Sequence, residues 1–194
     1  MQSEYADFKS AEELKIWLKN FVSLADWSRG GAKSVEQLFD EIRNGDCSIQ
    51  TEPPLRIVRV VQVLVQRDNL FLLEKEQLLA DNRTRLRNLP PSEKMKPGEE
   101  CQAAAVRCLE EELGINEDQV EMIGLSSGPK IIVRSSTSYP GLNSKYFIFP
   151  VVVKVNHLPE QDFWTDEQSS GGDHEVIHRH RWGWGEIDPE TTPL

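Results

Sequence analysis

The chain has 194 residues, of which 38% are apolar, and it carries a formal net charge of −10 with a sequence pI near 4.9. A chain of this length can bury one good core but not two large ones, so we expect one domain with an extension. The acidic balance argues against broad binding to nucleic acids or anionic membranes, because both need a basic protein surface.

Cysteine usage and the N-terminal sequence indicate the compartment. The chain has three cysteines, an odd number without paired spacing, which argues against a disulfide framework and favours a reducing compartment. The opening residues MQSEYADFKS contain no apolar run, and no later stretch approaches the roughly 20 apolar residues of a membrane span. We therefore expect a soluble, cytoplasmic protein without a membrane anchor.

Two amphipathic helices are predicted near the N-terminus. The sequence Ser10-Ala11-Glu12-Glu13 is typical of a capping box, and the apolar residues that follow it share one side of a helix: Leu14, Trp17, Leu18 and Phe21. A second helix is expected to begin at Ser34 and to end near Asn44-Gly45. We therefore expect a helical N-terminal extension over residues 1–50 and a main domain over residues 51–194.

The main domain is expected to be rich in strands. Residues 55–65 contain many β-branched side chains and, after a turn at 67–69, residues 70–73 continue the pattern, which predicts a hairpin. Further strands are predicted over residues 120–125, 130–133, 145–155 and 175–182.

The acidic helix lies in the segment 93–115, EKMKPGEECQAAAVRCLEEELGI, where a Pro-Gly-Glu turn precedes a run that ends in clustered carboxylates. With about 100° per residue, Gln102, Val106, Leu109 and Leu113 share one stripe, which we expect to be buried. Cys108 falls at an angle between Glu111 and Glu112, so we expect it in the middle of an acidic face. Two such carboxylates repel each other unless a cation neutralises them, and Arg107 lies one turn before Glu111. The simpler alternative is a solvated acidic helix end.

At these residues the chain resembles the Nudix hydrolase family, whose box reads G-x5-E-x7-R-E-U-x-E-E-x-G-U, where U is a bulky apolar residue. The matching positions are Glu99, Arg107, Leu109, Glu111, Glu112, Gly114 and Ile115. Two positions depart from the box: Glu93 replaces the opening glycine, and Cys108 replaces the glutamate after the arginine. The resemblance implies a Nudix-like α/β/α sandwich with a mixed sheet.

The resemblance also implies a chemistry for the box residues. Glu111 and Glu112, assisted by Glu99, would hold Mg²⁺ or Mn²⁺, since these ions prefer hard oxygen ligands. Together with Arg107 they would form the catalytic set. A thiol is a soft ligand, so Cys108 is expected to weaken the binding of metal.

Two functions are consistent with this pattern. The first is a divalent-metal-dependent pyrophosphohydrolase, weakened by Cys108, that acts on a compound linked to a nucleoside diphosphate. The alternative is a catalytically impaired Nudix-fold module that binds a nucleotide or a protein partner. In either case we expect a small phosphorylated, nucleotide-like ligand and a monomer or homodimer.

Three residues outside the box are candidates for substrate binding. Arg83, Arg85 and Arg87 alternate along an extended segment, so Arg85 and Arg87 could contact phosphate oxygens from one face, although a solvated strand face is the simpler reading. Tyr139 lies in a polar loop and could stack on a base, although a Tyr-Pro-Gly turn needs no ligand.

The C-terminal part of the chain offers further candidates. His178, His180, Trp182 and Trp184 alternate, which is consistent with a two-histidine zinc pair, an aromatic platform or, more simply, core packing. Glu167 and Glu175 are candidates for an extra catalytic carboxylate by analogy with the family. The resemblance implies a second helix after the last strand, but only residues 185–194 follow here. We therefore expect the N-terminal helices to cover the sheet face that this helix would cover or, alternatively, to recruit a partner.

Overall fold

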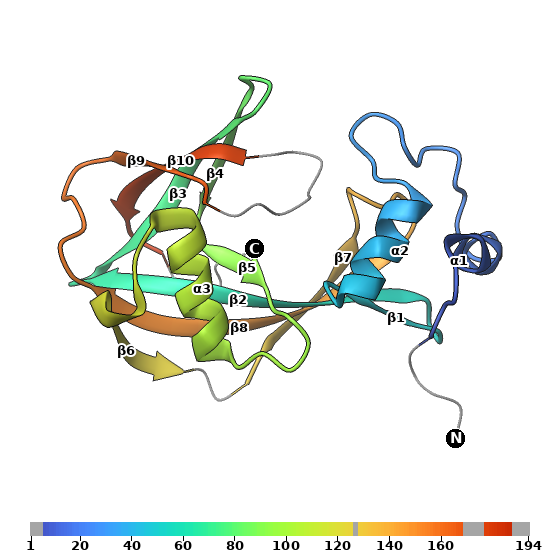
Figure 1. The fold of residues 1–194 in the computed structure, drawn as a ribbon, viewed down its shortest axis with the longest axis horizontal. Helices are drawn as coiled ribbons and strands as arrows, with labels where there is room; N and C mark the ends of the chain where they lie inside the picture. The colour runs from blue at the N-terminus through green and yellow to red at the C-terminus, as the bar shows by residue number, and fades with distance from the viewer. Residues whose placement is uncertain (1–5, 126–127, 169–176, 188–194) are drawn as a thin grey trace. The chain divides into compact units, whose positions relative to one another are not determined.

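The computed structural model describes residues 6–125, 128–168 and 177–187 (Figure 1). Its helices are α1 (Ala11–Leu18), α2 (Val35–Asn44) and α3 (Cys101–Leu113), with a short 3-10 helix over Glu117–Gln119. Its strands are β1 (Ser48–Gln50), β2 (Leu55–Arg67), β3 (Leu70–Leu79), β4 (Thr84–Leu89), β5 (Ser92–Lys94), β6 (Val120–Leu125), β7 (Lys130–Ser135), β8 (Asn143–Val155), β9 (Phe163–Asp166) and β10 (Ile177–Gly185). The predicted α/β class and the β2–β3 hairpin are confirmed.

The chain forms two compact units. Unit 1 consists of residues 1–60, 94–98 and 129–148, and unit 2 consists of residues 61–93, 99–128 and 149–194. The predicted boundary after residue 50, and the predicted covering of a sheet face by the N-terminal helices, remain predictions. Among the helices formed by the described residues, none is long and apolar enough to cross a bilayer.

Unit 1 contains the two N-terminal helices. The Ser34 hydroxyl accepts a hydrogen bond from Gln37 N at the start of α2, and Ser34 N donates to Gln37 Oε1. Gly45 ends the helix in the left-handed conformation (φ +79°). Strand β1 pairs antiparallel with the start of β2, and β7 pairs antiparallel with the first part of β8. The helix boundaries predicted at Ser34 and near Asn44-Gly45 are therefore confirmed.

A buried ionic cluster lies inside unit 1. The Glu41 carboxylate contacts Lys33 Nζ at 2.9 Å and Arg56 Nη2 at 2.5 Å, and Lys94 Nζ lies 3.9 Å away. Burial alone raises the pKa of Glu41, but the positive charges of Arg56, Lys94 and Lys33 outweigh it and lower the pKa to about 2. The carboxylate is therefore ionised and acts as the centre of the cluster.

Unit 2 contains the strands that surround the box helix. Strand β3 pairs with the end of β2, with β4 and with β10, and β10 pairs in turn with β9, each pair antiparallel. Strand β6 pairs antiparallel with the last part of β8. Leu64, Phe71 and Leu73 form a core cluster against which Val152 and Ile187 pack. Helix α3 contacts β9, which lies beside it in Figure 1.

Candidate active site at the end of helix α3

Helix α3 carries the box residues, and its buried face differs from the predicted stripe. The buried side chains are Ala104, Ala105, Cys108, Leu109 and Leu113, whereas Gln102 is exposed and Val106 is only partly buried. The predicted stripe is therefore right for its last two members and wrong for its first. The buried face of α3 is rotated from the predicted stripe towards Ala104, Ala105 and Cys108. Small side chains such as these allow a helix backbone to approach its neighbours closely.

Arg107 connects two of the predicted catalytic glutamates. Its Nε and Nη2 atoms lie 2.9 and 3.1 Å from the two carboxylate oxygens of Glu99, which is a bidentate pair, and its Nη1 atom lies 3.3 Å from Glu111 Oε2. Burial opposes the charge, but the bonds and charges of Glu99, Glu93 and Glu111 raise the pKa of Arg107. The guanidinium thus fixes the directions of Glu99 and Glu111.

The environment of the Glu112 side chain is more enclosed and more acidic than that of Glu99 and Glu111. Part of the residue is exposed, but its carboxyl group is surrounded by protein. Burial and then the charges of Glu74, Glu93 and Glu167 raise the pKa of Glu112 well above its usual range, against the opposite effect of His180. A positive charge at this place would relieve the repulsion.

Cys108 lies beside the carboxyl groups of Glu112 and Glu93, as the helix angles predict, but it is buried inside the protein. It is 0% exposed, and burial together with the charges of Glu112 and Glu93 raises the pKa of its thiol well above the usual value. The thiol is therefore neutral, and a neutral buried thiol is neither a nucleophile nor a ligand for a hard cation. The difference from our expectation follows from the rotated buried face of α3.

His180 forms a second ionic group beside Glu112. It is 1% exposed, its Nδ1 atom lies 2.5 Å from Glu74 Oε1, and its Nε2 atom lies 2.8 Å from Glu167 Oε2. Burial lowers the pKa of His180, but the hydrogen bonds to Glu167 and Glu74 and the charge of Glu112 outweigh it and raise the pKa to about 9. The ring is therefore an imidazolium at neutral pH and donates to both carboxylates.

The histidine and tryptophan pattern of β10 is only partly core packing. Trp182 is buried and stacks on His180 with ring centroids 5.6 Å apart, whereas His178 is exposed. Trp184 lies under Arg67, whose guanidinium carbon is 4.0 Å from the ring centroid. Glu167 contacts His180, and Glu175 lies outside the described residues.

The candidate substrate residues lie in different units. In unit 2, Arg85 and Arg87 lie on one face of β4; Arg85 Nε donates to Gln77 at 2.8 Å and Arg87 Nε lies 3.1 Å from Glu74 Oε2. In unit 1, Tyr139 is 0% exposed and packs against Trp27. A ring enclosed in this way offers no surface for stacking on a base, contrary to the expectation for Tyr139.

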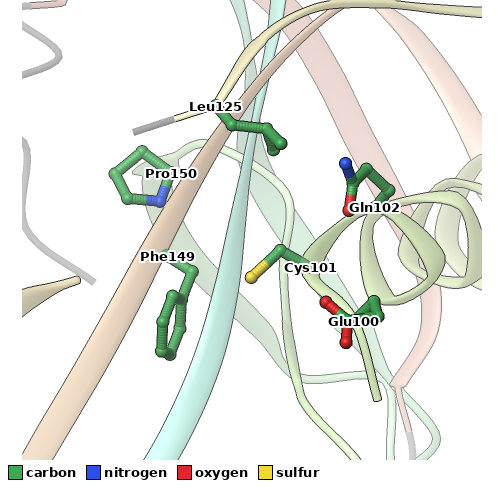
Figure 2. Close-up of a pocket in the computed structure, with 6 residues that line it drawn as sticks. All are labelled: Glu100, Cys101, Gln102, Leu125, Phe149 and Pro150. Atoms are coloured by element: carbon green, nitrogen blue, oxygen red, sulfur yellow. The ribbon is translucent and has the colours of Figure 1, made fainter. Parts of the chain in front are cut away.

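A small pocket lies at the opposite, N-terminal end of α3. It is lined by Glu100, Cys101, Gln102, Leu125, Phe149 and Pro150, and Figure 2 shows the Cys101 thiol pointing towards Phe149 and Pro150. Its volume of about 130 Å³ is below the roughly 300–1,000 Å³ of typical ligand pockets. It is therefore too small to hold a nucleotide.

The residues at the end of α3 fit a divalent cation by charge and by donor type. Glu112 is close enough to three other carboxylates for its pKa to rise, and carboxylate oxygens are the ligands that Mg²⁺ and Mn²⁺ prefer. Within the part of the chain that the structure describes, however, no three His, Cys, Asp or Glu side chains are gathered closely enough to hold an ion. Glu99 and Glu111 are instead turned towards Arg107.

The fold and the site together define an α/β domain whose helix ends in paired glutamates next to an arginine, as the box predicts. A family model described as the NUDIX domain matches residues 54–182. This is more than half of the chain, so the protein belongs to the Nudix hydrolase family.

Solved structures of the family show more distant likeness. An Ap4A hydrolase of C. elegans in a binary complex is 20% identical with a TM-score of 0.38, covering 66% of this chain and 80% of that chain. A NUDIX hydrolase from Nitrosomonas europaea is 21% identical with a TM-score of 0.38, covering 65% and 72%. A MutT NUDIX hydrolase from Burkholderia pseudomallei is 18% identical with a TM-score of 0.36, covering 71% and 89%. No curated protein matches the sequence significantly.

Sequence reasoning missed several residues of this site. Glu74 was missed because the predicted strand ended at residue 73, whereas β3 continues to Leu79. Thr165, whose hydroxyl donates to the Glu112 carbonyl oxygen at 2.6 Å, was missed because β9 has only 4 residues and was not predicted. The alternation of His180 and Trp182 and the family analogy for Glu167 were the signals available for the ionic group of His180, Glu74 and Glu167.

Proposed function

We propose that the protein is a Nudix pyrophosphohydrolase that acts on a small compound containing a nucleoside diphosphate. The observation that carries this proposal is the carboxylate cluster around Glu112 at the end of the box helix, next to the Arg107 bridge between Glu99 and Glu111. Membership of the family over residues 54–182 supports the reaction type.

In this proposal the box residues have distinct roles. Glu112 and Glu111 hold Mg²⁺ or Mn²⁺, Glu99 assists them, and Arg107 orients Glu99 and Glu111 through the bonds described above. A divalent cation bound there would neutralise the diphosphate and lower the pKa of a water molecule. The enclosed position of Glu112 supports its role as the main ligand, because a carboxyl group with a raised pKa gains most from a nearby positive charge.

We further propose that Arg85 and Arg87 contact the phosphates of the substrate. Both side chains point to one face of β4. Each would exchange its present partner, Gln77 or Glu74, for a phosphate oxygen, since guanidinium groups bind phosphate through two parallel hydrogen bonds.

The proposal is tested by turnover with a matched control. Purified wild-type protein is incubated with Mg²⁺ or Mn²⁺ and a panel of nucleoside diphosphate compounds, and the release of phosphorylated products is measured. Glu112→Gln is expected to abolish turnover, because it removes the charge of the proposed main ligand. Glu110→Gln is the control, because Glu110 is exposed on the same helix and is expected to leave turnover unchanged. Equal turnover in wild type and Glu112→Gln would refute the proposal.

The alternative is a binding module that has lost catalysis. It is favoured by one observation, the neutral buried thiol of Cys108 at the position where the box has a glutamate. Calorimetry separates the two functions: nucleotide binding by the wild type without any released product, in the presence of either metal, would select the binding module.

A further inference from the structure

The C-terminal end of α3 carries both Glu111 and Glu112, and its last carbonyl groups have no partner within the helix. Just past the helix, Gly114 N donates to Glu110 O at 3.0 Å and Ile115 N donates to Leu109 O at 3.2 Å. The left-handed Gly114 (φ +68°) makes this turn possible.

The next two carbonyl groups are satisfied from outside the helix. Thr165 Oγ1 donates to the Glu112 carbonyl oxygen at 2.6 Å, and the Gln168 backbone N–H donates to the Glu111 carbonyl oxygen at 2.9 Å. Both donors belong to β9 or to the residues directly after it. The carbonyl groups of the two proposed metal ligands are therefore bonded by β9 and by the segment directly after it.

Thr165 is in turn held by β10. A hydroxyl group has one proton, and Thr165 gives it to Glu112, so it accepts the hydrogen bond from Trp182 Nε1 at 2.7 Å. Because an indole N–H can only donate, the direction of the chain from Trp182 through Thr165 to Glu112 is fixed. Trp182 is 0% exposed and stacks on His180, so the start of this chain is anchored in the core.

We propose that Thr165 is a positioning residue for the paired glutamates of the box. Its hydroxyl fixes the backbone at Glu112, and this fixes the directions in which the Glu111 and Glu112 side chains leave the helix. The catalytic part of this inference rests on the proposed function. A displacement of about 1 Å in a catalytic group can lower a rate by roughly 10²-fold, so one hydrogen bond at this place has a large effect.

The chemistry of threonine permits a sharp test. Thr165→Val keeps the shape but leaves both the Glu112 carbonyl and the Trp182 indole without a partner, whereas Thr165→Ser keeps the hydroxyl. Trp184→Phe is the matched control, because it removes another indole hydrogen bond of β10, the one from Trp184 Nε1 to Pro159 O at 2.8 Å, which does not lead to α3.

The first measurement does not depend on turnover. Amide hydrogen exchange of the full-length protein is expected to show a loss of protection over residues 111–115 in Thr165→Val, and the Trp182 indole N–H resonance is expected to shift. Both are expected to be normal in Thr165→Ser, and protection over 111–115 is expected to be normal in Trp184→Phe. Normal protection over 111–115 in a folded Thr165→Val protein would overturn the inference, whatever the enzyme activity.

The second measurement uses a substrate hydrolysed by the wild type. In Thr165→Val, kcat is expected to fall by about 10–100-fold with little change in KM, and Thr165→Ser is expected to recover most of the loss. An unchanged kcat in Thr165→Val would overturn the positioning role but leave the proposed function intact. Absence of turnover in the wild type would count against the proposed function alone, because the exchange measurement still decides the role of Thr165.

Discussion

Restoring the glutamate of the box at position 108 is expected to make the stability of the protein dependent on metal. Cys108 is 0% exposed and lies close to the carboxyl groups of Glu112 and Glu93. A buried charge without a partner costs several kcal/mol, and the larger side chain adds about 1–3 kcal/mol of overpacking, so we take a loss of about 4 kcal/mol for Cys108→Glu without metal. At about 2–4 °C per kcal/mol for a chain of this size, the Tm falls by roughly 8–16 °C.

A divalent cation is expected to reverse much of this loss. A ligand at 100 times its Kd stabilises the folded state by about 2.7 kcal/mol, so saturating Mn²⁺ is expected to raise the Tm of Cys108→Glu by roughly 5–11 °C. The effect on the wild type is expected to be smaller, because a neutral thiol contributes nothing to the site.

The assay is calorimetric unfolding in EDTA and in Mn²⁺. Cys101→Glu is the matched control, because it introduces the same side chain into the first turn of α3, where a negative charge is favourable. It is expected to unfold close to the wild type under both conditions. The reasoning is refuted if Cys108→Glu unfolds at the wild-type temperature in EDTA, or if Mn²⁺ shifts both proteins equally.

The ionic groups and one glycine give three further predictions, each measured as stability against the wild type. His180→Gln is expected to destabilise the protein by about 3–5 kcal/mol. Because the pKa of His180 is raised from 6.5 to about 9, this loss of stability is present below pH 6.5 and disappears as the pH rises through 9. A loss that stays constant with pH would contradict this prediction. For Glu41→Gln the pH dependence of the stability loss is expected to be the opposite. Because the pKa of Glu41 is lowered from 4.5 to about 2, the loss is present above pH 4.5 and disappears as the pH falls through 2. A loss of stability that persists in acid would be inconsistent with this. Gly45→Ala is expected to cost more than the roughly 1–2 kcal/mol of left-handed strain, because a Cβ atom there would overlap Pro97 Cγ. Gly98→Ala, with open space around it at φ +73°, is expected to show the strain alone, and equal losses in the two variants would exclude the clash.

The sequence predicted the elements with strong local signals. Strand β6 was predicted with its observed bounds, and the end of α2 at Gly45 was predicted from the left-handed preference of glycine. The short strands β1 and β9 were missed, because 3 or 4 residues are too few to show a period. Helices and strands are therefore predicted well from the sequence where they are long or where a specific residue, such as glycine, marks their end.

The site was harder to predict because its residues meet through tertiary packing. The angular position of Cys108 between Glu111 and Glu112 follows directly from helix geometry, but the side of α3 that becomes buried was decided by Ala104 and Ala105, which a search for large apolar residues overlooks. The partners of His180 come from β3 and from the residue after β9, which are distant in sequence. No local pattern encodes such contacts.

The two departures from the box pattern are expected to be coupled. Glu93 and Cys108 are far apart in sequence, yet the Glu93 charge raises the pKa of both Cys108 and Glu112, so the box gains one carboxylate in the same cluster where it has lost another. A glutamate at position 108 would then repel Glu93 as well as Glu112. Removing Glu93 should relieve part of this repulsion.

A double-mutant cycle measures this coupling. The chain carrying both Cys108→Glu and Glu93→Gly is expected to be more stable in EDTA than the sum of the single changes predicts, by an interaction energy of about 0.5–3 kcal/mol. Urea unfolding of the wild type, the two single variants and the double variant gives the four free energies required. Because independent sites add within about 0.3–0.5 kcal/mol, additivity within that limit would mean that Glu93 does not act on the site of Cys108. A favourable interaction would instead explain why one chain carries both substitutions, since each makes the other less costly.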